Sequence, residues 1–259
     1  MPRKWYHNFM VKCDDVLQFW NTQLNSAAIP DASRNGLQVQ GAETVRKIVF
    51  GVSASLELFR RAQVAGADLI CVHHGLLWGH EQPLTGLFGQ RVRFLMQHNI
   101  GLAAYHLPLD KHPKIGHNAC LIRALHATQI KPFATYHDVT IGYEGRLPGV
   151  SLEKVTKTLE QFCHTHAQVV PFGPQKIKRV GVVSGGAYSM LPQAIDRQLD
   201  LYVTGILDEP AYEWCREGKI NCIALGHYHS EKCGIEALMK MTAQKFAVKT
   251  QFIDITNPL

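Results

Sequence analysis

Short apolar runs alternate along this chain with stretches in which apolar side chains recur every three or four positions. The runs predict buried strands, and the stretches predict amphipathic helices that cover them. Strands are expected at residues 47–53, 68–72, 100–106 and 167–172, and helices at residues 9–24, 56–65, 90–98, 118–127 and 151–163. In the helix at 56–65 we expect Leu56, Phe59 and Val64 to face the sheet. This alternation favours an α/β fold with a mostly parallel sheet.

The strand at residues 68–72 ends in two adjacent histidines, His73 and His74, followed by Gly75. Successive strand residues point to opposite faces, so the two side chains diverge unless the strand ends there. In open α/β sheets the carboxyl ends of the strands are where ligands bind. Two imidazoles at that end are therefore candidate metal ligands, although a single histidine there is also typical of a hydrogen-bonded structural group.

The chain from residue 178 onward repeats the order of elements seen from residue 47 onward. Asp68 stands twenty residues after Ile48, and Asp200 stands twenty residues after Val180. In each half a later strand ends in a histidine that an acid follows four positions on: His106 and Asp110, then His227 and Glu231. The shared order predicts an internal duplication, in which two similar α/β units pack together. The crevice between the copies is then the expected site.

The predicted lobes are discontinuous along the chain. Residues 1–128 are expected to form the first α/β lobe, which residues 222–259 rejoin, and residues 129–221 are expected to form the second. The sheets are expected to be largely parallel or mixed, with the helices on both sides.

Composition narrows the class of protein. The chain has 259 residues, 46% of them hydrophobic, and a net charge of +6, which favours anionic partners such as nucleotides. The basic residues are dispersed, so a dedicated nucleic-acid groove is the weaker interpretation. Seven cysteines without a Cys-x-x-Cys pair argue against a disulfide framework and favour a cytoplasmic protein. We find no signal-peptide core and no apolar run long enough to span a membrane.

The polar groups at the strand ends are mostly imidazoles and carboxylates. Such mixed ligands suit zinc, iron, manganese, cobalt or nickel better than magnesium or calcium. With two carboxylates beside the histidines, the chain offers more ligands than one catalytic zinc ion needs. Each carboxylate has two oxygens and can therefore bridge two metal ions. Asp110 and Glu231 are therefore candidates to bridge two ions, with His73, His74 and His227 as terminal ligands. Such a pair of ions activates water, which is hydrolytic chemistry.

Other histidines have structural interpretations. His106 is either a residue that supports the ligands or a core histidine bonded to backbone, and Glu231 is alternatively a first-turn acid of a helix. We expect His112, His117 and His229 to be solvated loop residues, with His229 also a candidate for the substrate pocket. Asn35, in the Asn-Gly turn of residues 32–38, is another candidate, because exposed amides there could line a site.

Four motifs in this order resemble the Nif-three-like family, also called the GTP cyclohydrolase 1 type 2 homologs. They are Asn35-Gly-Leu-Gln38, Val72-His-His-Gly75, His106-Leu-Pro-Leu-Asp110 and Gly226-His-x-x-x-Glu231. The resemblance covers nearly the whole chain. It implies two interlocked α/β lobes, a dinuclear metal site at their interface, and a homohexameric ring that encloses a cavity. It also implies the ligand set His73, His74, Asp110, His227 and Glu231, which is the set reached above.

One segment departs from the family pattern. Where the family often has an acid after Thr-Gly and a histidine later, this chain has Ile206 and Glu213, with Asp208 and Glu209 nearby as possible substitutes.

Two functions fit the sequence. The first is a dimetal hydrolase, with GTP cyclohydrolase as the named possibility, although the chain has no P-loop and no tight Arg/Lys cluster for a triphosphate. The second is a non-enzymatic metal-binding scaffold, or a protein that binds nucleic acid through a ring cavity.

Overall fold

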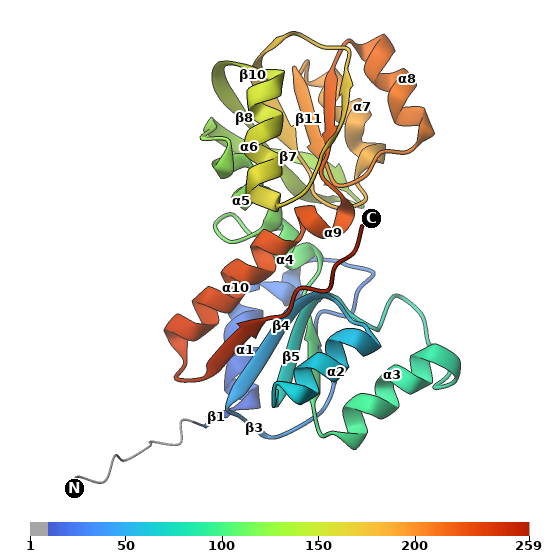
Figure 1. Ribbon diagram of the computed structural model, residues 1–259, viewed down its shortest axis with the longest axis vertical. Coiled ribbons are helices and arrows are strands. Elements are labelled where there is room, and N and C mark those ends of the chain that lie inside the picture. Colours follow the sequence, from blue (N-terminus) through green and yellow to red (C-terminus); the bar gives the residue numbers. More distant parts are fainter. Residues whose placement is uncertain (1–9, 259) are drawn as a thin grey trace, which may run out of the picture. The chain divides into compact units, whose positions relative to one another are not determined.

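The chain forms two compact α/β units. A computed structural model describes residues 10–258 (Figure 1). Unit 1 consists of the chain up to His106 together with Glu236–Ile255, and unit 2 consists of Leu107–Ile235 and the residues from Thr256 on. The first division falls before residue 107 instead of after residue 128, because the helix α5 (His117–Ala124) packs its apolar side chains on the sheet of unit 2.

The main sheet of unit 1 has five strands in the order β13-β4-β5-β6-β2. Strands β13, β4, β5 and β6 are parallel, and β2 is antiparallel to β6. The bounds are β2 Gly36–Val39, β4 Lys47–Ser53, β5 Leu69–His74, β6 Gly101–Ala104 and β13 Lys249–Phe252. A separate two-stranded sheet joins β1 (Val11–Lys12) and β3 (Thr44–Val45). The mixed, mainly parallel sheet confirms the predicted fold class.

The helices of unit 1 present the apolar faces that the periodicity predicted, with one error. They are α1 Cys13–Leu24, α2 Leu56–Val64 and α3 Gly86–Gln97, with a 3-10 turn η1 at Ser26–Ala28. The prediction for Val64 was wrong, because this side chain is 84% exposed at the last position of α2. The helix instead buries Leu58, Phe59 and Ala62, which share one face at helical spacing.

In unit 1, α1 is tied to the returning C-terminal segment. Trp20 is fully buried, and its Nε1 donates a hydrogen bond of 2.8 Å to Oγ1 of Thr242 in α10 (Lys232–Lys245). A buried indole N–H needs such an acceptor, so this bond joins two segments that are far apart in the sequence. The C-terminal segment of unit 1 begins within α10 at Glu236, whereas the sequence predicted its start at residue 222.

The sheet of unit 2 has six strands in the order β7-β8-β10-β11-β12-β9. Strands β10, β11 and β12 are parallel, whereas β7, β8 and β9 pair antiparallel with their neighbours. The bounds are β7 Thr128–Tyr136, β8 Val139–Ser151, β9 Gln168–Pro171, β10 Lys176–Val182, β11 Leu201–Thr204 and β12 Asn221–Ala224. The shorter helical elements are α4 Leu107–Lys111, η2 Tyr188–Met190, α7 Leu191–Asp196, α8 Glu209–Gly218 and α9 His227–Ser230.

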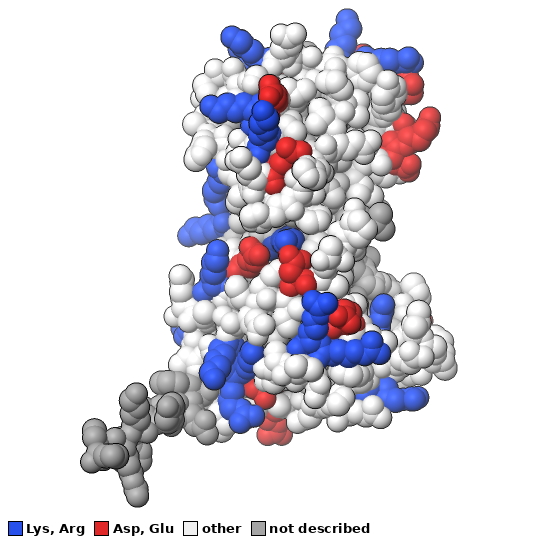
Figure 2. All heavy atoms as spheres, in the orientation of Figure 1, with Lys and Arg blue, Asp and Glu red and all other residues white. Residues whose placement is uncertain are grey.

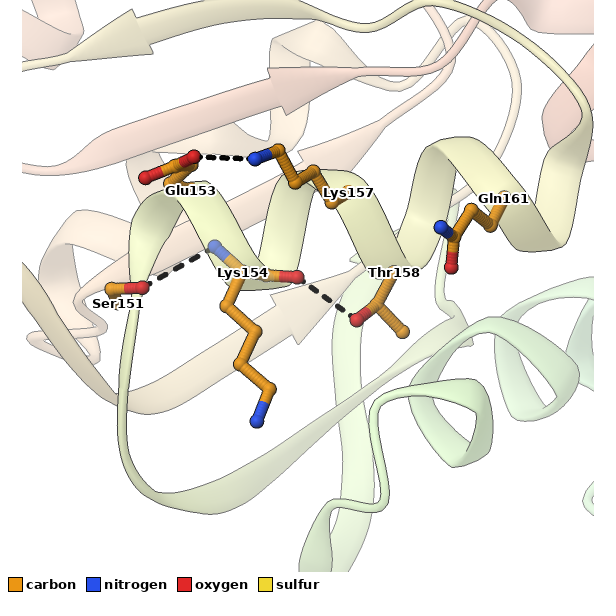
Figure 3. Close-up of a pocket in the computed structure, with 6 residues that line it drawn as sticks. All are labelled: Ser151, Glu153, Lys154, Lys157, Thr158 and Gln161. Carbon is orange, nitrogen blue, oxygen red and sulfur yellow. Dashed lines mark hydrogen bonds and ion pairs between the residues drawn. The ribbon is translucent and has the colours of Figure 1, made fainter.

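Helix α6 (Leu152–Cys163) begins where the sequence predicted. The Ser151 side chain accepts a hydrogen bond from the Lys154 amide, which is the N-cap interaction that serine supplies (Figure 3). Glu153 and Lys157 form an ion pair four residues apart on the solvent face, and the Thr158 hydroxyl bonds back to the Lys154 carbonyl (Figure 3). The shallow hollow drawn there is thus bounded by groups that stabilise the helix.

The internal repeat is visible in the backbone of both units. In unit 1 the Asp68 carboxylate accepts hydrogen bonds from the amides of Arg46 and Lys47, at 2.7 and 3.0 Å. In unit 2 the Asp200 carboxylate accepts the equivalent bonds from two amides, at 2.7 and 2.8 Å, namely those of Lys178 and Arg179. The acid that begins the second strand of each copy therefore caps the first strand. Both acids accept two backbone amides of the preceding strand, which agrees with the repeat predicted from the sequence.

Charged side chains are mixed over the visible surface. Figure 2 shows Lys and Arg interspersed with Asp and Glu on both units, with acidic side chains gathered over α8. No face in this view is basic throughout, which agrees with the dispersed charge of the sequence. Among residues 10–258, no helix is both long and apolar enough to cross a bilayer.

Candidate metal centre

In unit 1, β5 ends in His73 and His74, whose rings lie close together although the residues are adjacent. The ring centroids are 4.6 Å apart. The strand ends at His74, and the backbone turns at Gly75, where a Cβ atom would lie 2.4 Å from the Gln38 side chain. The turn removes the strict alternation of a continuing strand, so both imidazoles occupy the carboxyl end of the sheet as predicted.

Hydrogen bonds set the protonation of the His73 ring. Its Nδ1 lies 2.9 Å from the carbonyl oxygen of Tyr105, and the residue is fully buried. A carbonyl only accepts, so Nδ1 carries the hydrogen and Nε2 carries the lone pair. This arrangement, in which one ring nitrogen donates to a backbone carbonyl, is typical of histidines that ligate metals. The Nδ1 of His74 lies 3.1 Å from Oγ of Ser53, on the neighbouring strand β4.

His106 joins these two rings through a carboxylate that the sequence did not indicate. Its Nδ1 lies 2.9 Å from Oδ1 of Asp31, and its backbone amide donates a 2.8 Å hydrogen bond to Oδ1 of Asn35. The Asn35 side chain in turn donates to Oδ2 of Asp31 at 2.9 Å. The predicted turn thus contributes Asn35 as a support for His106, which was a candidate, and adds Asp31, which was missed.

The three histidines of unit 1 form what we call the imidazole cluster: His73, His74 and His106. One ring nitrogen of each lies within 4.8 Å of the others. The partner of His106 Nδ1 is the Asp31 carboxylate, which can only accept a hydrogen bond. As in His73, Nδ1 therefore carries the hydrogen and Nε2 carries the lone pair. The aromatic ring of Trp78 packs edge-on against His106, with centroids 5.0 Å apart, and covers one side of the cluster.

The electrostatics of Asp31 favour its charged form. Burial acts to raise the pKa of this carboxyl, but the bonds from His106, Asn35 and the Ser33 amide outweigh it and hold the pKa below its ordinary value. Asp31 therefore stays ionised, and it fixes both the orientation and the tautomer of His106. The only sequence signal for this role was its position at the edge of the Asn-Gly turn.

In unit 2, a second group of candidate ligands gathers around the turn that follows β10. Asp110, in α4, is 5% exposed, and Oγ of Ser184 lies 3.3 Å from its Oδ1. The Ser184 amide donates a 2.6 Å hydrogen bond to Asn118, whose Nδ2 bonds the Ile141 carbonyl at 3.0 Å. This network fixes the position of Asp110 relative to the sheet.

The other side of the same turn holds His227 and Glu231. Their Nε2 and Oε2 atoms are 3.3 Å apart, and both residues belong to the α9 segment that follows β12. Gly185 has φ +70°, and a Cβ atom on it would lie 2.2 Å from Oε1 of Glu231. Its amide donates to Oγ of Ser230 at 3.0 Å. Only glycine fits here. The residues on the two sides of this turn are what we call the carboxylate cluster: Asp110, which contacts Ser184, and the pair His227 and Glu231 beside Gly185.

The remaining histidines differ from one another. The prediction that His117 is solvated was wrong: it is fully buried in α5, and its Nδ1 accepts a 3.0 Å hydrogen bond from the Gly234 amide. The His117 ring thus accepts a backbone hydrogen bond from the first turn of α10. His112 is half-buried in a loop, where its Nδ1 accepts the amides of Lys114 and Ile115. His229 is half-buried in α9, and its Nδ1 is enclosed without a hydrogen-bond partner among the described residues.

The segment that departs from the family pattern lies beside His227. Ile206 is 36% exposed, and its Cδ1 is 3.8 Å from the Cβ position of Gly186, which is 3.6 Å from Cε1 of His227. The Asp208 carboxylate caps α8 through the Glu209 amide at 2.8 Å, so its role is structural. Glu213 pairs with Arg216 on the surface of α8.

Both clusters fit a borderline divalent metal. Neutral imidazoles and ionised carboxylates are the donors that zinc, iron, manganese, cobalt and nickel accept. The contacts with Tyr105, Ser53 and Ser184 orient His73, His74 and Asp110 as outer contacts orient such ligands. Asp31, Ser184 and Gly185 were not found from the sequence, because each acts through a neighbour distant in the chain. The clusters were found because their residues stand at strand ends.

Known proteins resemble this chain over its whole length. A GTP cyclohydrolase 1 type 2 homolog of Pyrococcus horikoshii is 40% identical over 247 residues, which cover 95% of this chain and 98% of the relative. One of Escherichia coli is 36% identical, with coverage of 96% and 100%. The solved structure described as protein ybgI of unknown function has a TM-score of 0.90 and 35% identity, and covers 96% of this chain and 100% of that one.

A more distant structure, reduced HcgD from Methanocaldococcus jannaschii, has a TM-score of 0.85 at 22% identity, with 95% of this chain and 99% of that chain covered, and shows the fold alone. The family model for Duf34/NIF3 (NGG1p interacting factor 3) matches residues 11–258. The chain therefore belongs to the Duf34/NIF3 family.

Proposed function

We propose that the chain binds two divalent metal ions and uses them for hydrolysis. The ligands are the five residues that the sequence singled out: His73, His74, Asp110, His227 and Glu231. The observation that carries the proposal is the orientation of the ligand His73: the Tyr105 carbonyl holds its Nδ1 and leaves the lone pair on Nε2, beside the ring of His74 at the end of β5.

A pair of divalent ions supplies an activated water and a clamp on the attacked oxygen. The chain's own residues then have separate tasks. Asp110 and Glu231 would supply carboxylate oxygens to the ions, and His73, His74 and His227 would supply imidazole nitrogens. His106 stays outside the ligand set: Asp31 holds its Nδ1 hydrogen, so Nε2 can accept a proton from the attacking water. Trp78 excludes solvent from one side of His106.

The substrate of this hydrolysis is not fixed by the ligands. The relatives are named GTP cyclohydrolase 1 type 2 homologs, and hydrolytic opening of a purine ring needs a metal-activated hydroxide. A nucleotide or another anionic molecule is therefore the first substrate class to test, which also agrees with the net charge of +6. We further propose that the chain assembles into a homohexamer, which light scattering of the purified protein would test.

The test combines metal content with turnover. Elemental analysis of the full-length protein should give about two divalent ions per chain, and screening nucleotides and phosphoesters with that metal restored should find a hydrolysed substrate. His74→Ala and Glu231→Gln should each lose metal and turnover. Matched controls are His166→Ala and Glu153→Gln, because both side chains are largely exposed, at 105% and 75%.

Three results would contradict this proposal in different ways. One ion or fewer per chain in wild type would exclude the dinuclear site. Loss of metal in Glu231→Gln but not in His74→Ala would remove His74 from the ligand set. A full complement of metal with no turnover across the screen would instead favour a non-enzymatic metal-binding protein.

A further inference from the structure

A small polar cavity lies on the sheet of unit 2, built from residues outside both clusters. It has a volume of about 90 Å³, and its charged lining comes from β7, β8 and β10: Lys131, Glu144, Arg146 and Arg179. Gln129 completes one wall at a bulge of β7, where its backbone takes φ +51°. Non-glycine residues rarely adopt this conformation, and bulges of this kind commonly redirect a strand beside a binding site.

The strand register brings like charges together in this cavity. Arg146 of β8 stands directly opposite Arg179 of β10 in the antiparallel pair, so the two side chains share a face. Like charges directly opposite each other destabilise a sheet. Within the part of the chain that the structure describes, neither guanidinium has a carboxylate within ion-pair distance. An anion between them would convert this repulsion into attraction.

Two further charged side chains lie beside Arg146 and Arg179 on the same face of the sheet. Lys131 of β7 stands opposite Glu144 of β8, and Glu144 is two residues from Arg146, which places its side chain on the same side of the sheet. The Oε1 atom of Glu144 is 3.8 Å from Arg197, but its Oε2 atom is enclosed and has no hydrogen-bond partner among the described residues. The cavity therefore combines an excess of positive charge with one carboxylate oxygen that needs a donor.

We propose that this cavity binds a phosphate group that carries a proton. Three cationic side chains, Lys131, Arg146 and Arg179, would hold the charged oxygens, and Arg fits such an oxyanion with paired N–H donors. Glu144 would accept the hydrogen bond of the P–OH group. A carboxylate in an anion site otherwise repels its ligand, so its presence selects a protonated oxyanion. Inorganic phosphate keeps a hydroxyl proton at neutral pH, whereas sulfate keeps none.

The size of the cavity supports a small ligand. A volume of about 90 Å³ holds a group of a few heavy atoms and not a whole nucleotide. The phosphate can be free or can be the end of a larger molecule that extends into solvent. Orthophosphate and a simple monoester therefore form two arms of the test. The ester arm is run at about pH 6, because a monoester with a second pKa near 6 still carries the P–OH proton there in about half of its molecules. Tighter binding of the ester at that pH would identify the second source.

Isothermal titration of the full-length protein with sodium phosphate and with sodium sulfate, at equal ionic strength, tests the proposal. Wild type should bind phosphate at least about tenfold more tightly than sulfate, because each charge-assisted bond contributes on this scale. Glu144→Gln should abolish the preference by binding sulfate as well as phosphate. Arg179→Gln should weaken the binding of phosphate at least about tenfold. Lys178 is the exposed residue next to Arg179 and does not line the cavity, so Lys178→Gln should leave the affinity for phosphate unchanged.

Thermal unfolding gives a second readout that a merely structural role would not produce. Without phosphate, Arg179→Gln should raise the Tm, since it removes the repulsion with Arg146. With saturating phosphate, the Tm of Arg179→Gln should instead be lower than that of wild type, because the ligand stabilises only the protein whose site is intact. Equal binding of phosphate and sulfate by wild type, or the same response of Arg179→Gln and Lys178→Gln, would overturn the proposal.

Discussion

Nδ1 of His106 lies 2.9 Å from Oδ1 of Asp31, whose side chain is only 2% exposed. This contact joins the predicted Asn-Gly turn to the end of β6 and sets the tautomer of the ring nearest to His73 and His74. A buried carboxylate that receives several hydrogen bonds stabilises the fold only while it is ionised. The same contact therefore links the geometry of the imidazole cluster to pH.

Asp31→Asn should lower the free energy of unfolding at neutral pH, and the difference from wild type should become smaller in acid. The pKa of Asp31 is lower in the folded chain than its ordinary value. A depressed pKa adds stability above the unfolded pKa, near about 4, and this stability is lost as the pH falls through the folded value. We expect a loss of about 1–2 kcal/mol at pH 7, measured by urea unfolding, that narrows below about pH 4.

Asp138→Asn is the control for this measurement, because Asp138 is exposed in the β7–β8 turn and asparagine tolerates its φ of +65°. It should show little change at either pH. A deficit in Asp31→Asn that stays constant from pH 7 to pH 3 would contradict the assigned role.

Gly185→Ala should disturb the carboxylate cluster specifically. A Cβ atom there would lie 2.2 Å from Oε1 of Glu231, in addition to the strain of φ +70°. Gly66→Ala is the matched control, since Gly66 has φ +74° but no atom within 4 Å of its Cβ position. Both variants should lose about 1 kcal/mol from the backbone strain, and only Gly185→Ala should also weaken metal binding, measured by titration with a chromophoric chelator. Equal metal affinity in the two variants would argue against a role for this turn.

Asp200→Ala and Asp68→Ala should each destabilise the chain by about 2–4 kcal/mol. Each carboxylate accepts two backbone amides at the start of the preceding strand, and charge-assisted bonds of this kind contribute more than neutral ones. Asp196→Ala, at the exposed end of α7, should stay within about 0.5 kcal/mol of wild type. Denaturant midpoints measure all three, and a mild effect at only one of the two repeat positions would show that the copies have diverged.

Buried cysteines should resist alkylation in the folded chain. Burial raises the pKa of the Cys163 thiol to about 12, and burial together with the Asp14 charge raises that of Cys13 to about 11. The thiolate is the reactive form, so neither should react with iodoacetamide at pH 8, whereas the partly exposed Cys120 should react faster. Mass spectrometry after a timed exposure reports each site. Rapid labelling of Cys163 without prior unfolding would contradict its place in the core.

The elements that the sequence predicted well are those in which local pattern and burial agree. The strand at Lys47–Ser53 and the helix capped by Ser151 occur as expected, because an apolar run and a capping serine act through near neighbours. Val64 and His117 were misjudged for the opposite reason. The burial of each depends on which other element covers it, and composition does not encode that partner directly.

The sequence by itself determined the α/β class, the repeated order of elements, and the positions of the five candidate ligands at strand ends or within a few residues after them, because these follow from periodicity and spacing along one chain. The tertiary structure alone decided which groups orient the residues of the candidate site. Asp31 reaches His106 across 75 positions, and Ser184 reaches Asp110 across 74, so only the folded backbone brings each donor to its acceptor. The pairing of Arg146 with Arg179 likewise depends on strand register, which is set when β8 and β10 pack together.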